Sequence, residues 1–118
     1  MKKSFFAGLM LIACMFIYSC GSEPKEIDLD ANRDVVRDFH RIWSDGNVME
    51  LEKIISPDFV CHFINEIEWK GIDGAKHSIT SHRKIFPDWK EEIVDMVSEG
   101  DKVVTRYRST GTQLGAFE

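Results

Sequence analysis

Two runs with a period of two, at residues 91–98 and 103–110, constrain the fold of this chain more than any other feature. In the first run, Glu91, Ile93, Asp95 and Val97 alternate with Glu92, Val94, Met96 and Ser98. The string Glu99-Gly100-Asp101 separates the two runs. A period of two on both sides of a glycine-containing turn predicts a β-hairpin, in which each alternating set shares one face of its strand.

An apolar stripe with helical spacing precedes this hairpin, at residues 32–44. Its members follow the i, i+1, i+4, i+7, i+8 pattern: Val35, Val36, Phe39, Ile42 and Trp43. This spacing predicts an amphipathic helix with its charged residues largely outside the stripe. Gly46 suits a left-handed cap, so the helix is expected to end at the string Asp45-Gly46-Asn47.

Three further segments lie between this helix and the hairpin: a helix at 48–55, a strand at 59–64 and a helix at 74–86. Pro57 ends the first of these helices, Asp73 can cap the second and Pro87 ends it. Residues 65–70 fit either a loop or an extension of the strand. The order of elements predicts an α+β domain with three helices on one face of an antiparallel sheet.

The N-terminus has the organisation of a secretory signal. Lys2 and Lys3 precede an apolar run at residues 5–18, in which only Gly8 is outside the apolar set. Fourteen residues are too few to span a bilayer as a helix, which needs about 20. Residues 1–19 are therefore predicted to be a signal peptide.

The end of this run, Ile17-Tyr18-Ser19-Cys20-Gly21, resembles the lipobox of bacterial lipoproteins, in which the cysteine becomes the acylated N-terminus. Cys14 ends a second such string, but cleavage there would leave a very short apolar run. The resemblance implies lipidation of Cys20 and a location at the cell envelope on a membrane anchor. Residues 20–31 are then expected to be a tether, and residues 32–118 the folded domain. An ordinary signal peptide or an uncleaved anchor is the alternative.

Charge and cysteine content exclude several classes of function. Cleavage before Cys20 removes 19 of the 118 residues and two lysines, which leaves 99 residues and changes the net charge from −5 to −7. This acidic balance argues against a nucleic-acid partner.

His77 and His82 are five residues apart and so do not share a helix face as metal ligands would, and no metal site is expected. Cys61 would be the only free thiol, and its apolar neighbours favour a packed side chain over a nucleophile.

Four local strings occur in an order that resembles one known family. They are Ser56-Pro57-Asp58-Phe59-Val60 with His62, residues 71–75, Phe86-Pro87-Asp88-Trp89, and residues 99–104 continuing through Arg106 to Gly111-Thr112. Together they are similar to the SnoaL-like polyketide cyclases, or ester cyclases, of the nuclear transport factor 2-like superfold. The resemblance implies a cone of curved antiparallel sheet around helices, with a hydrophobic pocket that takes a small apolar carbonyl compound. It also implies ring closure by an intramolecular aldol reaction without a cofactor.

The resemblance also implies which residues line the pocket: His62, Trp89, Arg106 and Gln113. His62 is the candidate acid or base, because it matches the histidine after the family's Pro-Asp-Phe-Val string. A histidine side chain ordinarily titrates near neutral pH, which suits proton transfer there. Gln113 replaces a common family histidine and keeps a hydrogen-bonding group without a titratable one.

Family members continue beyond the position of Glu118 with closing strands that carry the catalytic aspartate, so this domain is expected to be incomplete at its C-terminus. The alternative function is a non-catalytic ligand-binding or assembly module of the same superfold. An incomplete sheet would expose an unpaired strand near residues 103–110, which predicts a poorly soluble or homo-oligomeric protein.

Structural roles are expected for several other polar residues. Asp58 and Asp88 follow prolines and fit turn chemistry. Asp95 is expected to pair across the hairpin with Arg106 or Arg108. His40 is expected at the edge of the first helix's apolar face.

Overall fold

The computed structural model describes residues 26–63 and 66–116. Within them, helices and antiparallel strands alternate as the sequence predicts, and the α+β class is confirmed. The predicted signal segment, with Cys14 and Cys20, lies outside the described residues. Among the helices of the described part, none has both the length and the apolar character needed to cross a membrane.

Helix α1, Leu29–Asp45, begins three residues before the predicted start. The Asp28 side chain accepts hydrogen bonds from the backbone N–H groups of Asp30 and Ala31, and this N-cap extends the helix toward the N-terminus. At the other end Gly46 adopts a left-handed conformation with φ +75° and donates its N–H to the carbonyl of Ile42, as predicted.

The second and third helices differ in detail from the prediction. The short helix η1, Val48–Lys53, is a 3₁₀ helix that ends two residues before Ile55. Helix α2, Gly71–Ile85, begins directly after a strand, and Asp73 lies in its first turn rather than at the N-cap, so the predicted Asp73 cap is wrong. Gly71 makes this early start possible, because its φ of +65° turns the chain into the helix while its N–H donates to the carbonyl of Phe59.

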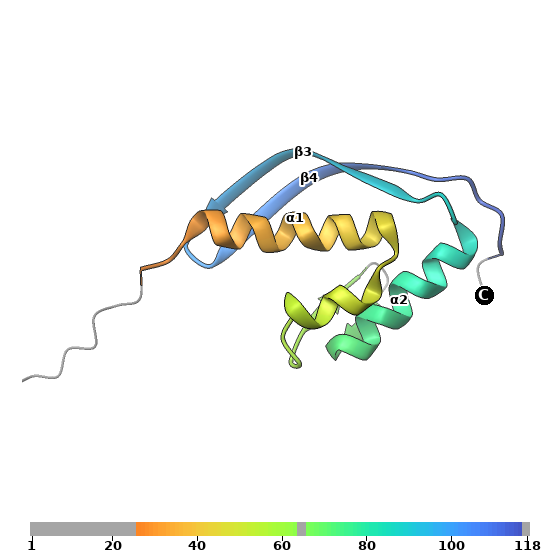
Figure 1. Cartoon of the computed structure of the whole chain (residues 1–118), viewed down its shortest axis with the longest axis horizontal. Helices are drawn as coiled ribbons and strands as arrows, with labels where there is room; N and C mark the ends of the chain where they lie inside the picture. Colours follow the sequence, from red (N-terminus) through yellow and green to blue (C-terminus); the bar gives the residue numbers. More distant parts are fainter. Residues whose placement is uncertain (1–25, 64–65, 117–118) are drawn as a thin grey trace, which may run out of the picture.

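The strands form two separate antiparallel pairs in the described part of the chain. β1, Val60–His62, pairs with β2, Glu68–Lys70, so residues 65–70 do contain a strand. β3, Lys90–Glu99, pairs with β4, Lys102–Thr110, around a tight turn in which Gly100 has φ +56°. This second hairpin arches over α1 (Figure 1), and its turn lies near the start of that helix, where the Asn32 amide donates to the carbonyl of Gly100.

A bulge interrupts β3 at Val94. The register passes from Ile93 opposite Tyr107 to Asp95 opposite Arg106, which leaves Val94 without a partner on β4. The half-buried positions of β3 are therefore 91 and 93 before the bulge but 96 and 98 after it. The expectation that Asp95 shares a face with Glu91 and Ile93 is wrong, because the extra residue reverses the alternation.

The hydrophobic core lies between the three helices. Ile42, Leu51 and Ile79 are completely buried, and Ala75 is nearly so. Partly buried side chains surround them: Phe39, Trp43, Val48, Ile54, Ile55 and Phe59. The β3–β4 hairpin does not contribute to this core, so the surface between the hairpin and α1 can carry polar groups.

Candidate functional site

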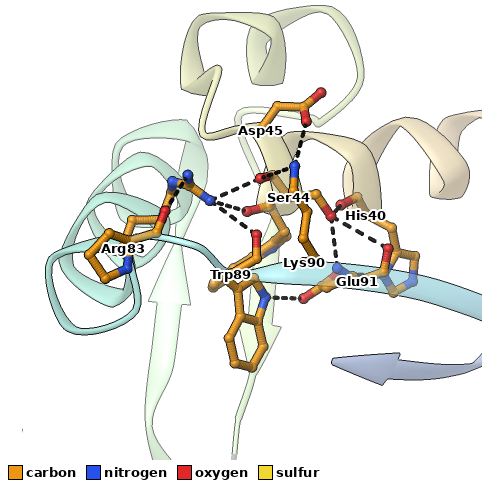
Figure 2. A network of polar contacts seen from close by, with 9 residues as sticks. His40, Ser44, Asp45, Arg83, Trp89, Lys90 and Glu91 are labelled. Carbon is orange, nitrogen blue, oxygen red and sulfur yellow. Dashed lines mark hydrogen bonds and ion pairs between the residues drawn. The ribbon is translucent and has the colours of Figure 1, made fainter. Parts of the chain in front are cut away.

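Two residues of α1, His40 and Ser44, face the beginning of β3 from successive turns of the helix. Both are buried. The Ser44 hydroxyl donates to the carbonyl of His40 at 3.0 Å and accepts the backbone N–H of Glu91 at 2.9 Å. Figure 2 shows this contact, which fixes the start of β3 against α1.

His40 and Glu91 form a buried hydrogen-bonded pair. Nδ1 of His40 donates to Oε2 of Glu91 at 2.6 Å, and their side chains are 10% and 6% exposed. The other carboxylate oxygen accepts the indole N–H of Trp89 at 3.0 Å. Nε2 of His40 lies 3.1 Å from the hydroxyl of Thr105 on β4. All four polar atoms of the pair therefore have partners, as buried polar groups require.

Tyr107 extends this group along β4. Its ring lies 4.6 Å from the imidazole of His40, and the residue is half exposed. Burial raises the pKa of the Tyr107 phenol, and the nearby Glu91 carboxylate and Cys61 thiol raise it further. The phenol is therefore protonated at neutral pH and can donate a hydrogen bond.

An aromatic wall adjoins Trp89. The imidazole of His82 on α2 lies among three aromatic rings, with centroid distances of 5.5 Å to Trp43, 5.0 Å to Phe86 and 4.3 Å to Trp89. Its buried Nε2 has no hydrogen-bond partner within the described residues. Burial lowers the pKa of His82, so the ring is neutral at neutral pH. We refer to His40, His82, Trp89, Glu91 and Tyr107 as the inner site.

Arg83 holds Trp89 in place. Its Nη1 donates to the carbonyls of Trp43, Ser44 and Trp89 at 3.3, 2.9 and 3.4 Å, and its Nη2 donates to the carbonyl of Pro87 at 2.8 Å. Two of these carbonyls end α1, where a cation also complements the helix dipole. The guanidinium thus ties the end of α1 to the segment that leads into β3 (Figure 2).

The four residues predicted to line a pocket lie in different surroundings. Trp89 belongs to the inner site. His62 is exposed on β1, and its Nδ1 lies 2.8 Å from Oε1 of Glu68, a carboxylate partner that the sequence did not identify. Arg106 is on the face of β4 opposite to Tyr107 and lies 3.9 Å from Asp95. Gln113 is exposed and donates to the carbonyl of Gly115 at 3.2 Å. Pocket roles for His62, Arg106 and Gln113 stay predictions.

The sequence failed to identify the buried pair of this site. His40 was expected at the edge of the helix face, and its burial there was not anticipated, because α1 is covered by the hairpin as well as by the other helices. The spacing of His40 and Ser44 at i and i+4 is the one local signal that could have indicated a second buried face.

Asp95 has the cross-strand role that was predicted, whereas the Asp88 carboxylate bonds a segment 24 residues away rather than its own turn. Asp95 pairs with Arg106 across the hairpin. The Asp88 carboxylate accepts the N–H and the hydroxyl of Thr112, and these two bonds lower its pKa. Thr112 directly follows Gly111, at which an added Cβ would lie 3.0 Å from the Trp89 ring. Asp88 therefore holds the chain after β4 close to Trp89.

Burial raises the pKa of the half-buried Cys61 thiol, which agrees with a packed side chain rather than a nucleophile. Across residues 26–63 and 66–116, no group of three potential metal ligands is assembled.

One sequence family matches most of the chain. The sequence profile of the SnoaL-like polyketide cyclases matches residues 33–118. No functionally curated protein matches the chain.

Several solved structures resemble the fold. A candidate polyketide cyclase of Bacillus cereus is 29% identical over 67% of this chain with a TM-score of 0.61, and one of Acidithiobacillus ferrooxidans is 30% identical over 69% with a TM-score of 0.60. TsrD of Streptomyces laurentii is 26% identical over 78% with a TM-score of 0.67. The matched region spans 53%, 61% and 67% of those proteins, respectively, so it is about half the length of the Bacillus cereus protein.

Proposed function

Because this chain belongs to the SnoaL-like polyketide cyclase family, we propose that its inner site binds a small apolar carbonyl compound, and either holds it or closes it into a ring without a cofactor. The observation that carries the proposal is the position of Trp89. Its indole lies against His82 on one side and is hydrogen-bonded to Glu91 on the other. An aromatic wall with few polar groups beside it is typical of sites for small apolar ligands.

Ring closure by an aldol reaction needs two proton transfers. A base removes a proton from the carbon next to one carbonyl, and the enolate carbon then forms a bond to the carbon of a second carbonyl. The alkoxide that results takes up a proton. Within the inner site, the His40–Glu91 pair is the group that can carry this proton, whereas the family resemblance points to His62.

One observation favours the alternative, a binding module without catalysis. Both oxygens of Glu91 and both ring nitrogens of His40 already have partners inside the protein. A base must reach the proton that it removes, so a fully satisfied pair has to exchange a partner before it can act.

Calorimetric titration of the full chain with acetylnaphthalene, an aromatic ketone, tests binding. Trp89→Phe removes the indole N–H and part of the wall, and we expect the affinity to fall about tenfold. Trp69→Phe is the matched control, since Trp69 contacts Trp43 and Phe63 but belongs to the neighbouring hairpin. Wild-type protein that fails to bind the ketone, or equal losses in both variants, would contradict binding at the inner site.

A linear aromatic diketone whose two carbonyls can close a six-membered ring distinguishes the two functions. Chromatographic detection of the cyclised product, above the rate in buffer, supports catalysis. Tight binding of the diketone with no product supports the binding module.

Lipid anchoring is a separate part of the proposal and rests on the residues around Cys20. In a bacterial host, Cys20→Ala should move the protein from the membrane fraction to the soluble fraction, because acyl chains supply the attachment. Cys14→Ala is the control and should leave the protein in the membrane fraction. Retention of the Cys20 variant, or release of the Cys14 variant, would overturn lipidation at Cys20.

A further inference from the structure

Tyr107 combines a fixed ring with a free hydroxyl. It lies on β4 opposite Ile93, next to the bulge, and is 47% exposed. Among the residues that the structure describes, its hydroxyl has no hydrogen-bond partner. The hydroxyl is therefore available to a molecule that enters the inner site.

The ring of Tyr107 is held by a neighbour that is itself fixed. His40 lies 4.6 Å from it, and the two nitrogens of His40 are bonded to Glu91 and Thr105. Because the imidazole cannot turn without breaking one of these bonds, it restricts the tyrosine ring that packs on it. A donor that is already positioned loses less entropy when a ligand binds.

The charge state of Tyr107 suits a donor. Partial burial and the Glu91 carboxylate both favour the protonated phenol. The charged groups of the neighbouring positions on β4, Arg106 and Arg108, lie on the opposite face of the strand and pair there with Asp95 and Glu92. The two guanidinium groups, which would favour the phenolate if they lay beside it, are therefore directed away from the phenol.

We propose that the hydroxyl of Tyr107 donates a hydrogen bond to the carbonyl oxygen of the ligand that the inner site binds. This inference rests on the proposed function, since it assigns the ligand's oxygen to one residue of the same site. The bond would strengthen as negative charge develops on that oxygen, so the same residue would stabilise an enolate if the protein catalyses ring closure.

Two probes of nearly equal shape test the assignment. Acetylnaphthalene carries the carbonyl, and isopropenylnaphthalene replaces its oxygen by a CH₂ group. Tyr107→Phe keeps the ring on His40 and removes only the hydroxyl. We expect this variant to bind the ketone about five- to tenfold more weakly than the wild type and to bind the hydrocarbon within about twofold of the wild type.

The carbonyl stretching frequency of the bound ketone gives a readout that packing alone would not move. It should lie lower in the wild type than in Tyr107→Phe, because a hydrogen bond weakens the C=O bond. An unchanged frequency and unchanged affinity for the ketone would overturn the role of Tyr107, and so would equal losses for both probes. Wild-type protein that binds neither probe would instead overturn the proposed function.

Discussion

Replacing Glu91 by leucine should destabilise this domain far more than replacing its neighbour Glu92. The Glu91 side chain is 6% exposed, and its two oxygens accept from His40 and Trp89. Leucine would leave the buried His40 donor and the half-buried Trp89 donor without a partner, at about 1–3 kcal/mol for each buried donor. Removal of one member of a buried pair costs about 3–5 kcal/mol, so we expect a loss in that range. Total stabilities are only about 5–15 kcal/mol, and the loss would be easy to measure.

Two further variants separate a lost partner from a lost shape. Glu91→Gln keeps an oxygen for Trp89, and its amide can donate to Nδ1 of His40 if the imidazole proton moves to Nε2, so the cost should be about 1 kcal/mol. In the double variant His40→Phe with Glu91→Leu, both members of the pair become apolar. This double variant should be more stable than Glu91→Leu alone by about 2 kcal/mol.

Urea unfolding of the full chain, followed by tryptophan fluorescence, measures these differences. Glu92 is the control because it occupies the other face of β3, is 75% exposed and lies 3.7 Å from Arg108. Glu92→Leu should change the stability by less than about 0.5 kcal/mol. Equal effects at positions 91 and 92, or a double variant that is no more stable than Glu91→Leu alone, would refute the reasoning. If Glu91→Leu does not fold, the double variant still tests the coupling.

Three further changes test other contacts. Burial lowers the pKa of His82 below its ordinary 6.5, so the neutral ring contributes to stability above pH 6.5, and this contribution is lost as the pH falls toward the folded-state pKa. The variant His82→Phe should therefore lose less stability in acid than the wild type. Equal shifts of the urea midpoint across pH 6.5 in the two proteins would contradict this. Arg83→Lys should lower the free energy of unfolding in urea by about 2 kcal/mol, because one ammonium cannot reach the four carbonyls that the guanidinium contacts. A decrease below about 0.5 kcal/mol would argue against a stabilising role for these four hydrogen bonds. Val104 and its partner Val97 on the hairpin are 68% and 62% exposed. If these apolar side chains mediate self-association, Val104→Thr should shift the protein toward monomer in sedimentation. A wild type that is already monomeric would contradict the proposed oligomer.

The elements that the sequence predicted well are those set by neighbouring residues. The apolar stripe of α1 and the glycine at position 46 define a helix and its end within one stretch of chain. The β3–β4 turn is likewise a local feature, since Gly100 supplies the positive φ that a tight hairpin requires. Capping was less predictable, because the strand β2 runs directly into α2 and leaves no separate position for the Asp73 side chain to cap.

The inner site could not be predicted, because its contacts join distant segments. His40 and Glu91 are 51 residues apart, and His40 and Thr105 are 65 apart. Whether a histidine at the border of an apolar stripe is buried depends on what covers that border, and here the cover is a hairpin whose face is set by a bulge. Sequence patterns give the period of a strand but not the position at which an extra residue reverses it.

The bulge at Val94 explains why the inner side of β3 carries one carboxylate rather than two. Without it, Asp95 would follow Glu91 and Ile93 toward α1 and would bring a second negative charge to the side where Tyr107 and Thr105 lie. With it, Met96 takes the inner position opposite Thr105, and Asp95 meets Arg106 on the outer face. Glu91 can then share its two oxygens between His40 and Trp89 without a competing acid. The polar part of the inner site therefore depends on an irregularity of the strand as much as on the residues themselves.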